Sequence, residues 1–129
     1  GDGSLQMVSQ EFATAMENNL PVIIALLDNG WLGMVKQWQK LFYGERYIAT
    51  KFGRNPDFVK LAEAYGAEAI KVERPSEVAE AIKRGVKAEV PMLLDFIVDP
   101  EEDVLPMLPP GKGSSDWIKG RCKWNGGVC

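Results

Sequence analysis

Two short polar turns carry the residue types that could bind a charged ligand. The first turn is Gly1-Asp2-Gly3-Ser4, and the second is Asp28-Asn29-Gly30. Glycines let backbone N–H groups approach phosphate oxygens, and carboxylate and amide oxygens are the hard ligands that Mg²⁺ prefers. The two turns therefore predict a site for a diphosphate carried by a divalent metal ion, with Asp2 and Asn29 supplying oxygen ligands.

The residues between the two turns predict one helix and one strand. Ser4 is expected to cap a helix that ends near Asn18, before Pro21, which cannot continue it. The expected buried face of this helix follows helical spacing and consists of Leu5, Val8, Phe12 and Ala15. Residues 22–27 are an unbroken apolar run, which is typical of a parallel strand covered on both faces.

The chain continues to alternate between helices and strands up to residue 98. Further helices are expected at residues 32–41, 55–66 and 75–85, and further strands at residues 68–72 and 91–98. Asn55 is predicted to cap its helix, with Pro56 at the first helical position, and a polar loop precedes it at residues 43–54. This order predicts an α/β fold with a parallel sheet flanked by helices. Asp28 and Asn29 then lie at the carboxyl edge of the sheet, where open α/β sheets bind ligands.

The composition limits the class of protein. The chain has 129 residues, which fits one compact unit. Its net charge is -3 and it lacks a basic run, which argues against nucleic acid as a partner. No apolar run approaches the ~20 residues of a membrane span. The absence of histidine excludes histidine-based triads, histidine proton relays and histidine-ligated zinc for this chain.

Residues 113–129 differ in character from residues 1–112, and we interpret them as an atypical segment that is appended or non-native. Both cysteines, Cys122 and Cys129, lie there, and neither a disulfide nor a metal site is favoured for them. A body without cysteines fits a reducing compartment, so we expect the cytoplasm, or a plastid if the source is a plant.

The first turn has no strand before it to hold it, so we expect the chain to be a fragment of a larger protein. A sheet without its upstream strand would have an exposed edge, and such edges favour self-association. A fragment that pairs with itself is therefore a further hypothesis.

The spacing of the two turns resembles the thiamine diphosphate motif, which is Gly-Asp-Gly, then about 25 residues of one helix and one strand, then Asn-Asn. Here residues 4–27 intervene, and Asp28 replaces the first asparagine. The following stretches closely resemble the large subunit of acetolactate synthase: residues 32–39, 41–43, 45–47, 103–107 and 109–112. The resemblance covers residues 1–112 and implies the C-terminal domain, which binds thiamine diphosphate.

The resemblance implies a role for each site residue. The cofactor site would comprise Gly1, Asp2, Gly3, Ser4, Asn29, Trp31, Gly33 and Met34. Asp2, the Asn29 side chain and the Trp31 carbonyl would bind Mg²⁺, while Gly3 and Ser4 would offer N–H groups to the phosphate. Gly33 and Met34 would lie against the cofactor rings. Finally, the substrate channel would be faced by Val35 and Trp38.

The family reaction follows from the cofactor. Pyruvate loses carbon dioxide, and the resulting enamine adds to a second pyruvate or to 2-oxobutyrate, on the route to branched-chain amino acids. The resemblance also implies a homodimer or tetramer, while a regulatory subunit and FAD are left open. The family's catalytic glutamate lies outside this chain, so the fragment alone is expected to be inactive.

Several alternatives remain at this point. Another pyruvate-using thiamine diphosphate enzyme, such as pyruvate oxidase or sulfoacetaldehyde acetyltransferase, is an alternative within the class. A non-catalytic module that binds Mg²⁺-diphosphate is an alternative from a different class. Asp2 could be a simple helix cap and Trp38 a core residue. We interpret Asp28 as a strand-end residue with a raised pKa rather than as a catalytic acid, and Gly30 departs from the acidic or amide residue of many relatives.

Overall fold

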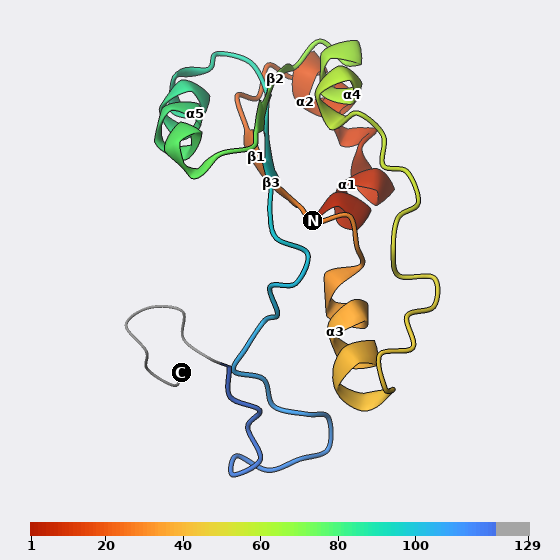
Figure 1. The fold of residues 1–129 in the computed structure, drawn as a ribbon. Coiled ribbons are helices and arrows are strands. Elements are labelled where there is room, and N and C mark those ends of the chain that lie inside the picture. The colour runs from red at the N-terminus through yellow and green to blue at the C-terminus, as the bar shows by residue number, and fades with distance from the viewer. Residues whose placement is uncertain (121–129) are drawn as a thin grey trace.

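A three-stranded parallel sheet forms the centre of the protein in a computed structural model that describes residues 1–120 (Figure 1). The strands are β1 (Ile23–Asp28), β2 (Glu68–Val72) and β3 (Met92–Ile97), and their order in the sheet is β1-β3-β2. β3 pairs in parallel with both neighbours, and Met92 stands opposite Ile23 on one side and Glu68 on the other. The predicted α/β fold with a parallel sheet is confirmed.

The helices cover both faces of this sheet. They are α1 (Asp2–Val8), α2 (Glu11–Glu17), α3 (Gly33–Phe42), α4 (Phe58–Ala64) and α5 (Pro75–Lys87). Figure 1 shows α1, α2 and α4 on one face and α5 on the other, while α3 lies beyond the carboxyl ends of the strands. The predicted helices at 32–41 and 75–85 are thus confirmed with small shifts of their ends.

The hydrophobic core consists of two clusters, one on each face of the sheet. Because successive side chains of a strand point to opposite faces, Leu93 of β3 joins one cluster and Met92 and Leu94 join the other. The larger cluster, beneath α1, α2 and α4, contains Leu5, Phe12, Leu26, Phe58, Ala62, Ala67 and Leu93. The cluster beneath α5 contains Val72, Ala81, Met92 and Leu94.

The first predicted helix is two helices in the structure. Between α1 and α2 the backbone hydrogen bonds span three residues instead of the four of an α-helix. Phe12 N donates to Ser9 O (3.2 Å), and Ala13 N donates to Gln10 O (3.0 Å). Periodicity alone could not locate this break. Ser4 does not cap the helix, because α1 already begins at Asp2 with Gly1 as its N-cap.

Three of the four residues expected on the buried face of this helix are buried, namely Leu5, Phe12 and Ala15. Val8 is half exposed, so the prediction for it is wrong. It is the last residue of α1, and the break that follows it separates it from the face that α2 buries.

The prediction that the first strand is covered on both faces is also wrong. β1 lies at the edge of the described sheet, and only Leu26 among its residues is buried. Ile23 is 42% exposed and Leu27 is 57% exposed. An apolar run shows that its side chains favour burial, but it does not show what covers them. Self-association through this edge stays a prediction, which sedimentation of the chain would test.

Helix α4 starts later than predicted. Asp57, rather than Asn55, is its N-cap, because the Asp57 side chain accepts a hydrogen bond from Lys60 N (3.1 Å). The segment Asn-Pro-Asp offers two capping residues, and the helix uses the second one. Asn55 is therefore available for a different role, described below.

The chain after β3 lies along α3, as Figure 1 shows in blue beside the orange helix. Further on, Met107 and Ile118 form an antiparallel bridge with N···O distances of 2.9 and 2.8 Å. The segment 113–120 thus folds back on residues before it. The predictions for Cys122 and Cys129 lie outside the described residues. Within residues 1–120, no helix is both long and apolar enough to cross a bilayer.

Candidate functional site

A hollow of about 410 Å³ at the carboxyl edge of the sheet brings together most of the predicted cofactor residues. Those lining it are Gly1, Gly3, Ser4, Asn29, Trp31, Gly33 and Met34, joined by Val35 from the predicted substrate channel. They meet because β1 ends where α1 and α3 begin. The predicted ligand Asp2 does not line the hollow, and Trp38 lines a different one.

Asp2 lies beneath the hollow and is only 1% exposed. Its Oδ2 accepts a hydrogen bond from Asn55 Nδ2 at 2.8 Å. The same Nδ2 donates to Asp28 Oδ1 at 3.1 Å, and Asp28 Oδ1 also accepts from Gly30 N at 3.0 Å. A single amide group therefore links the start of α1 to the end of β1.

The Asp28 carboxyl lies close to the carboxyl of Asp2, and this proximity changes the pKa of Asp28. Burial raises the pKa of the Asp28 carboxyl above its ordinary value, and the hydrogen bond and charge of Asp2 raise it further. The N–H groups of Gly30 and Asn55 oppose this rise in pKa. The raised pKa agrees with the interpretation of Asp28 as a strand-end residue with a raised pKa.

A third carboxylate, Asp95, lies on the central strand. It is 3% exposed, and its Oδ1 has no hydrogen-bond partner among the described residues. Burial raises the pKa of Asp95 to about 6, with the charge of Asp28 adding to the rise and Lys71 opposing it. Asp95 stands opposite Leu26 in β1, two residues before Asp28. We refer to Asp2, Asp28 and Asp95 as the acidic cluster.

The chemistry of the site fits a hard divalent cation. Repulsion among the carboxylates of the acidic cluster, two of which are buried and one partly buried, would be relieved by a nearby positive charge. In the described part of the chain, no group of three or more His, Cys, Asp or Glu side chains is arranged to hold a metal ion by itself. A bound Mg²⁺ would therefore need the amide and carbonyl oxygens of the second turn and oxygens of the ligand, which is the donor set that Mg²⁺ favours.

Asn29 faces the hollow with its side chain held in place. Asn29 Oδ1 accepts a hydrogen bond from Trp31 N at 3.0 Å, and its second lone pair remains for a cation. A Cβ atom on residue 33 would stand 2.9 Å from Asn29 Nδ2, which is too close. Gly33 is therefore required so that the Asn29 amide can occupy its position.

Gly3 has a packing role in addition to the predicted one toward phosphate. A Cβ atom there would lie 2.8 Å from Leu32 Cδ2 and 2.9 Å from Phe52 Cζ. The absence of a side chain at Gly3 thus allows the start of α1 to approach the segment before α3. Gly30 has a φ of 70°, a conformation that favours glycine, so glycine suits this position of the second turn.

Trp31 is fixed from several sides. Its ring makes an edge contact with Tyr47 at 5.5 Å between centroids, and Lys36 Nζ lies 4.6 Å from the ring centroid. Its backbone forms an antiparallel bridge with Lys51. These contacts hold the second turn against the loop that follows α3, so the Trp31 carbonyl has a defined place.

A second hollow of about 460 Å³ lies on α3 beside the first. Val35 lines both hollows, and Trp38, Tyr43 and Arg46 line the second. This arrangement agrees with a channel leading past Val35 and Trp38, although their role toward a substrate stays a prediction.

Asn55 and Asp95 are two site residues that the sequence patterns did not indicate. Asn55 was interpreted as a helix cap, and the signal that could have corrected this was the second capping residue, Asp57, two positions later. The signal for Asp95 was an acidic residue inside an otherwise apolar strand. Such a residue is rarely buried without a reason.

A parallel α/β domain with a glycine-containing hollow at the carboxyl edge of its sheet is typical of the class of domains that bind phosphate-containing cofactors. The family model described as "Thiamine pyrophosphate enzyme, C-terminal TPP binding domain" matches residues 1–96, and the chain belongs to this family.

Known relatives agree with this assignment. The chain is 50% identical over 111 residues to a probable acetolactate synthase large subunit of Methanococcus aeolicus, a match that covers 86% of this chain and 18% of that protein. It is 42% identical over 119 residues to the acetolactate synthase isozyme 2 large subunit of Escherichia coli K12, covering 92% and 22%. The predicted resemblance to these subunits is confirmed. The chain spans about a fifth of the length of these curated relatives.

A solved structure supports the fold. The thiamine diphosphate-dependent 4-hydroxybenzoylformate decarboxylase of Rhodococcus jostii RHA1 superposes with a TM-score of 0.71 at 27% sequence identity. The match covers 77% of this chain and 19% of that one. Both the family and the fold are thus those of the thiamine pyrophosphate enzymes.

Proposed function

We propose that this chain is the cofactor-binding part of an acetolactate synthase large subunit and binds thiamine diphosphate with Mg²⁺ in the hollow at the carboxyl edge of the sheet. The observation that carries the proposal is the meeting of both predicted turns and the start of α3 around this one hollow. The identity of 41–50% to several acetolactate synthase subunits supports the choice of enzyme.

Each site residue has a role in this proposal. Asp2, the Asn29 side chain and the Trp31 carbonyl hold the metal ion, while Gly3 and Ser4 face the diphosphate with backbone N–H groups. Gly33 and Met34 lie against the rings, because they line the hollow where α3 begins. Val35 and Trp38 border the path of the substrate. The bound cofactor supplies the carbanion chemistry that removes carbon dioxide from a 2-keto acid.

The substrates and partners belong to the longer protein. We propose pyruvate as the donor and a second pyruvate or 2-oxobutyrate as the acceptor, in a homodimer or tetramer, with FAD and a regulatory subunit as further components. The sequence contains no histidine, and the resemblance implies a catalytic glutamate in a motif that no residue of this chain matches. The 129 residues alone should therefore not consume pyruvate even with excess cofactor. Turnover by the isolated chain would contradict this.

Titration calorimetry tests the cofactor site directly. Thiamine diphosphate added to the chain in the presence of Mg²⁺ should release heat, and the substitution Asp2→Ala should abolish the signal because it removes the only carboxylate among the proposed ligands. Asp116→Ala is a matched control, since Asp116 is exposed and only accepts a hydrogen bond from Gly113 N. An unchanged signal in Asp2→Ala, with cooperative unfolding preserved, would place the metal ion elsewhere.

A second candidate function is decarboxylation without joining to a second keto acid. It is favoured by the likeness to the Rhodococcus decarboxylase, but the identity of 27% is lower than that to the acetolactate synthases. Product analysis of the longer protein separates the candidates. Acetolactate supports the first, a free aldehyde supports the second, and acetyl phosphate indicates pyruvate oxidase or sulfoacetaldehyde acetyltransferase.

A further inference from the structure

Asn55 was predicted to cap a helix, but in the structure its side chain lies between the two turns of the site. It comes from the loop before α4, yet its side-chain amide reaches both Asp2 (2.8 Å) and Asp28 (3.1 Å). Asp2 begins α1, and Asp28 ends β1 immediately before Asn29. Asn55 therefore sets the spacing between the two turns that form the hollow.

Asn55 is itself held from two directions. Gln6 Nε2 of α1 donates to Asn55 Oδ1 at 3.3 Å. On the chain side, Pro56 restricts the backbone, and Asp57 caps α4, whose first residue Phe58 is 2% exposed in the core. The Asn55 side chain is thus anchored to the hydrophobic core through α4, so its amide can hold the carboxylates of Asp2 and Asp28 in position.

A neutral donor has a particular advantage at this position. A lysine or arginine here would neutralise the carboxylates and reduce their attraction for a cation, and a carboxylate would add to the repulsion. The asparagine amide has two hydrogens and can donate one to each acid without changing the charge of the acidic cluster. It occupies Oδ2 of Asp2, so that the other oxygen, Oδ1, can serve a cation.

We infer that Asn55 is a positioning residue for the metal ion: it orients Asp2 and ties it to Asp28, so that Asp2 and Asn29 can share one Mg²⁺. This inference rests on the proposed function, since it assumes that Asp2 is a ligand. Mg²⁺ demands near-ideal octahedral geometry, whereas Ca²⁺ accepts flexible coordination. Loss of the amide therefore weakens Mg²⁺ binding more than Ca²⁺ binding.

The test measures the affinity of the 129-residue chain for each ion at a fixed, saturating concentration of thiamine diphosphate. Asn55→Ala should weaken Mg²⁺ binding by about 10-fold or more, as is usual when a partner of a metal ligand is removed, and should weaken Ca²⁺ binding less. Asn18→Ala is the matched control, because it removes an exposed asparagine that donates to Thr14 O at 2.8 Å. It should bind both ions as the unchanged chain does.

Urea unfolding without metal shows whether Asn55→Ala still folds cooperatively, so that a change in ion affinity can be separated from a loss of folding stability. A merely structural role would reduce the affinity for both ions in the same proportion, and that result would overturn the inference. If Asn55→Ala does not unfold cooperatively, Gln6→Ala decides, since it removes only the bond that holds Asn55 and should weaken Mg²⁺ about threefold and Ca²⁺ less. Equal effects of Gln6→Ala on both ions, or none, would overturn the inference.

The outcomes also distinguish the inference from the proposed function. If the unchanged chain binds Mg²⁺ with thiamine diphosphate and Asn55→Ala binds equally well, the inference fails and the cofactor site stands. If the unchanged chain binds neither ion with the cofactor, the proposed function fails and the inference fails with it.

Discussion

The sheet and the α3 region are stabilised by different forces. In the half of the molecule that contains the sheet, most of the buried side chains are apolar, as Phe58, Met92 and Leu93 show. In α3 the buried residues are instead Lys36 and Gln37, which are 3% and 2% exposed. One half is therefore held by hydrophobic burial and the other by directional polar contacts.

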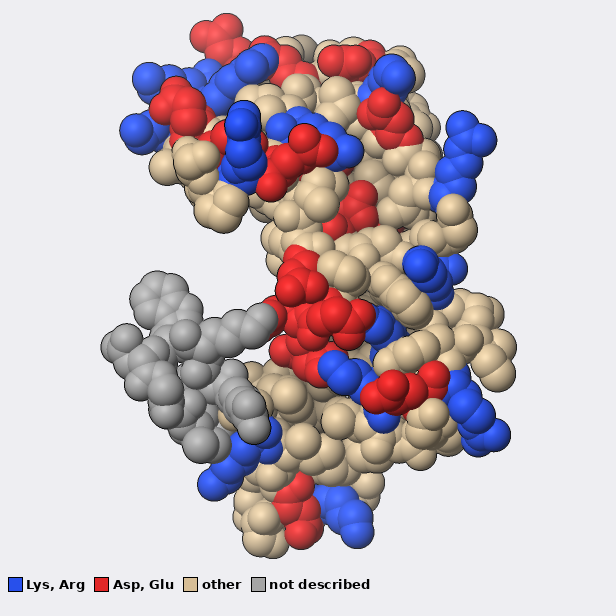
Figure 2. Space-filling view, viewed as in Figure 1, with Lys and Arg blue, Asp and Glu red and all other residues tan. Residues whose placement is uncertain are grey.

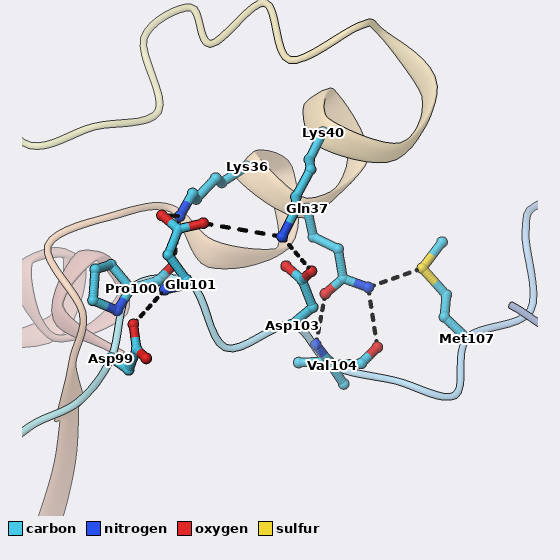
Figure 3. Close-up of polar contacts among 9 residues, drawn as sticks. All are labelled: Lys36, Gln37, Lys40, Asp99, Pro100, Glu101, Asp103, Val104 and Met107. Atoms are coloured by element: carbon cyan, nitrogen blue, oxygen red, sulfur yellow. Dashed lines mark hydrogen bonds and ion pairs between the residues drawn. The ribbon is translucent and has the colours of Figure 1, made fainter. Parts of the chain in front are cut away.

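The polar contacts join α3 to the segment after β3, residues 99–107, which we call the arm. Figure 3 shows Lys36 with Glu101 and the Pro100 carbonyl, and Lys40 with Asp103. Gln37 exchanges two hydrogen bonds with the Val104 backbone, at 2.7 and 3.0 Å. In Figure 2 acidic side chains gather at the middle of the molecule with basic ones beside them.

The difference has a consequence for the site. Val104 of the arm lines the hollow, so polar contacts of α3 place one of its walls. Directional contacts can open without exposing a large apolar area, whereas the sheet cannot. We therefore expect the arm to open locally while the sheet and the acidic cluster stay folded.

The largest expected effect is a loss of stability when a core side chain of the apolar half is removed. Phe58→Ala should lower the free energy of unfolding by about 3–5 kcal/mol, because it leaves a cavity where a 2% exposed ring packs. Urea unfolding measures this. Met7→Ala is the control, since Met7 is 71% exposed and should cost little. A small loss for Phe58→Ala would mean that burial does not dominate in the sheet.

Among the residues that the structure describes, Asp95 is one of two buried carboxylates in the apolar half, the other being Asp2, and its removal sharpens the comparison. The folded pKa of about 6 exceeds the ordinary 3.8, so its contribution to stability is full below pH 4 and is lost as the pH rises through 6. Without metal, Asp95→Asn should therefore stabilise the chain at pH 7.5 by up to about 3 kcal/mol and have little effect at pH 3.5. Asp116→Asn should change neither value, and a pH-independent gain for Asp95→Asn would contradict the assigned pKa.

Gln37→Ala tests the polar half. It removes both hydrogen bonds to Val104, so the free energy of local opening at the Val104 amide should fall by about 2 kcal/mol in hydrogen exchange. The Leu94 amide in β3 should keep its protection. Gln39→Ala is the matched control on the same helix, because Gln39 bonds to Ile48 and Thr50 instead of the arm. Equal loss at Val104 and Leu94 would show that the two halves open together.

The smallest effect is that of salt. Raising ionic strength from 0.05 to 1 M should accelerate exchange at Val104 by about threefold, because the pairs Lys36–Glu101 and Lys40–Asp103 are partly exposed and are screened. Exchange at Leu94 should not accelerate, because Leu94 is 1% exposed and is held by apolar packing in the cluster beneath α5. An exchange rate at Val104 that does not depend on salt would mean that hydrogen bonds alone hold the arm against α3.

The sequence by itself determined the class of fold, the order of its main elements and the place of the hollow. Gly1-Asp2-Gly3-Ser4 and Asp28-Asn29-Gly30 could be located from spacing, because a helix and a strand of known length must bring their ends to one edge of a parallel sheet. Strands were also expected at 68–72 and 91–98, and the structure confirms both within a residue or two at each end.

Only the tertiary structure decided which polar groups meet. Whether Asn55 or Asp57 caps α4 depends on where the helix packs, and that choice alone freed Asn55 to reach Asp2 and Asp28. The burial of Asp95 and the exposure of Leu27 likewise depend on the order of strands in the sheet. Local patterns specify which residues favour burial or a cap, but contacts between distant segments form only when the elements pack together.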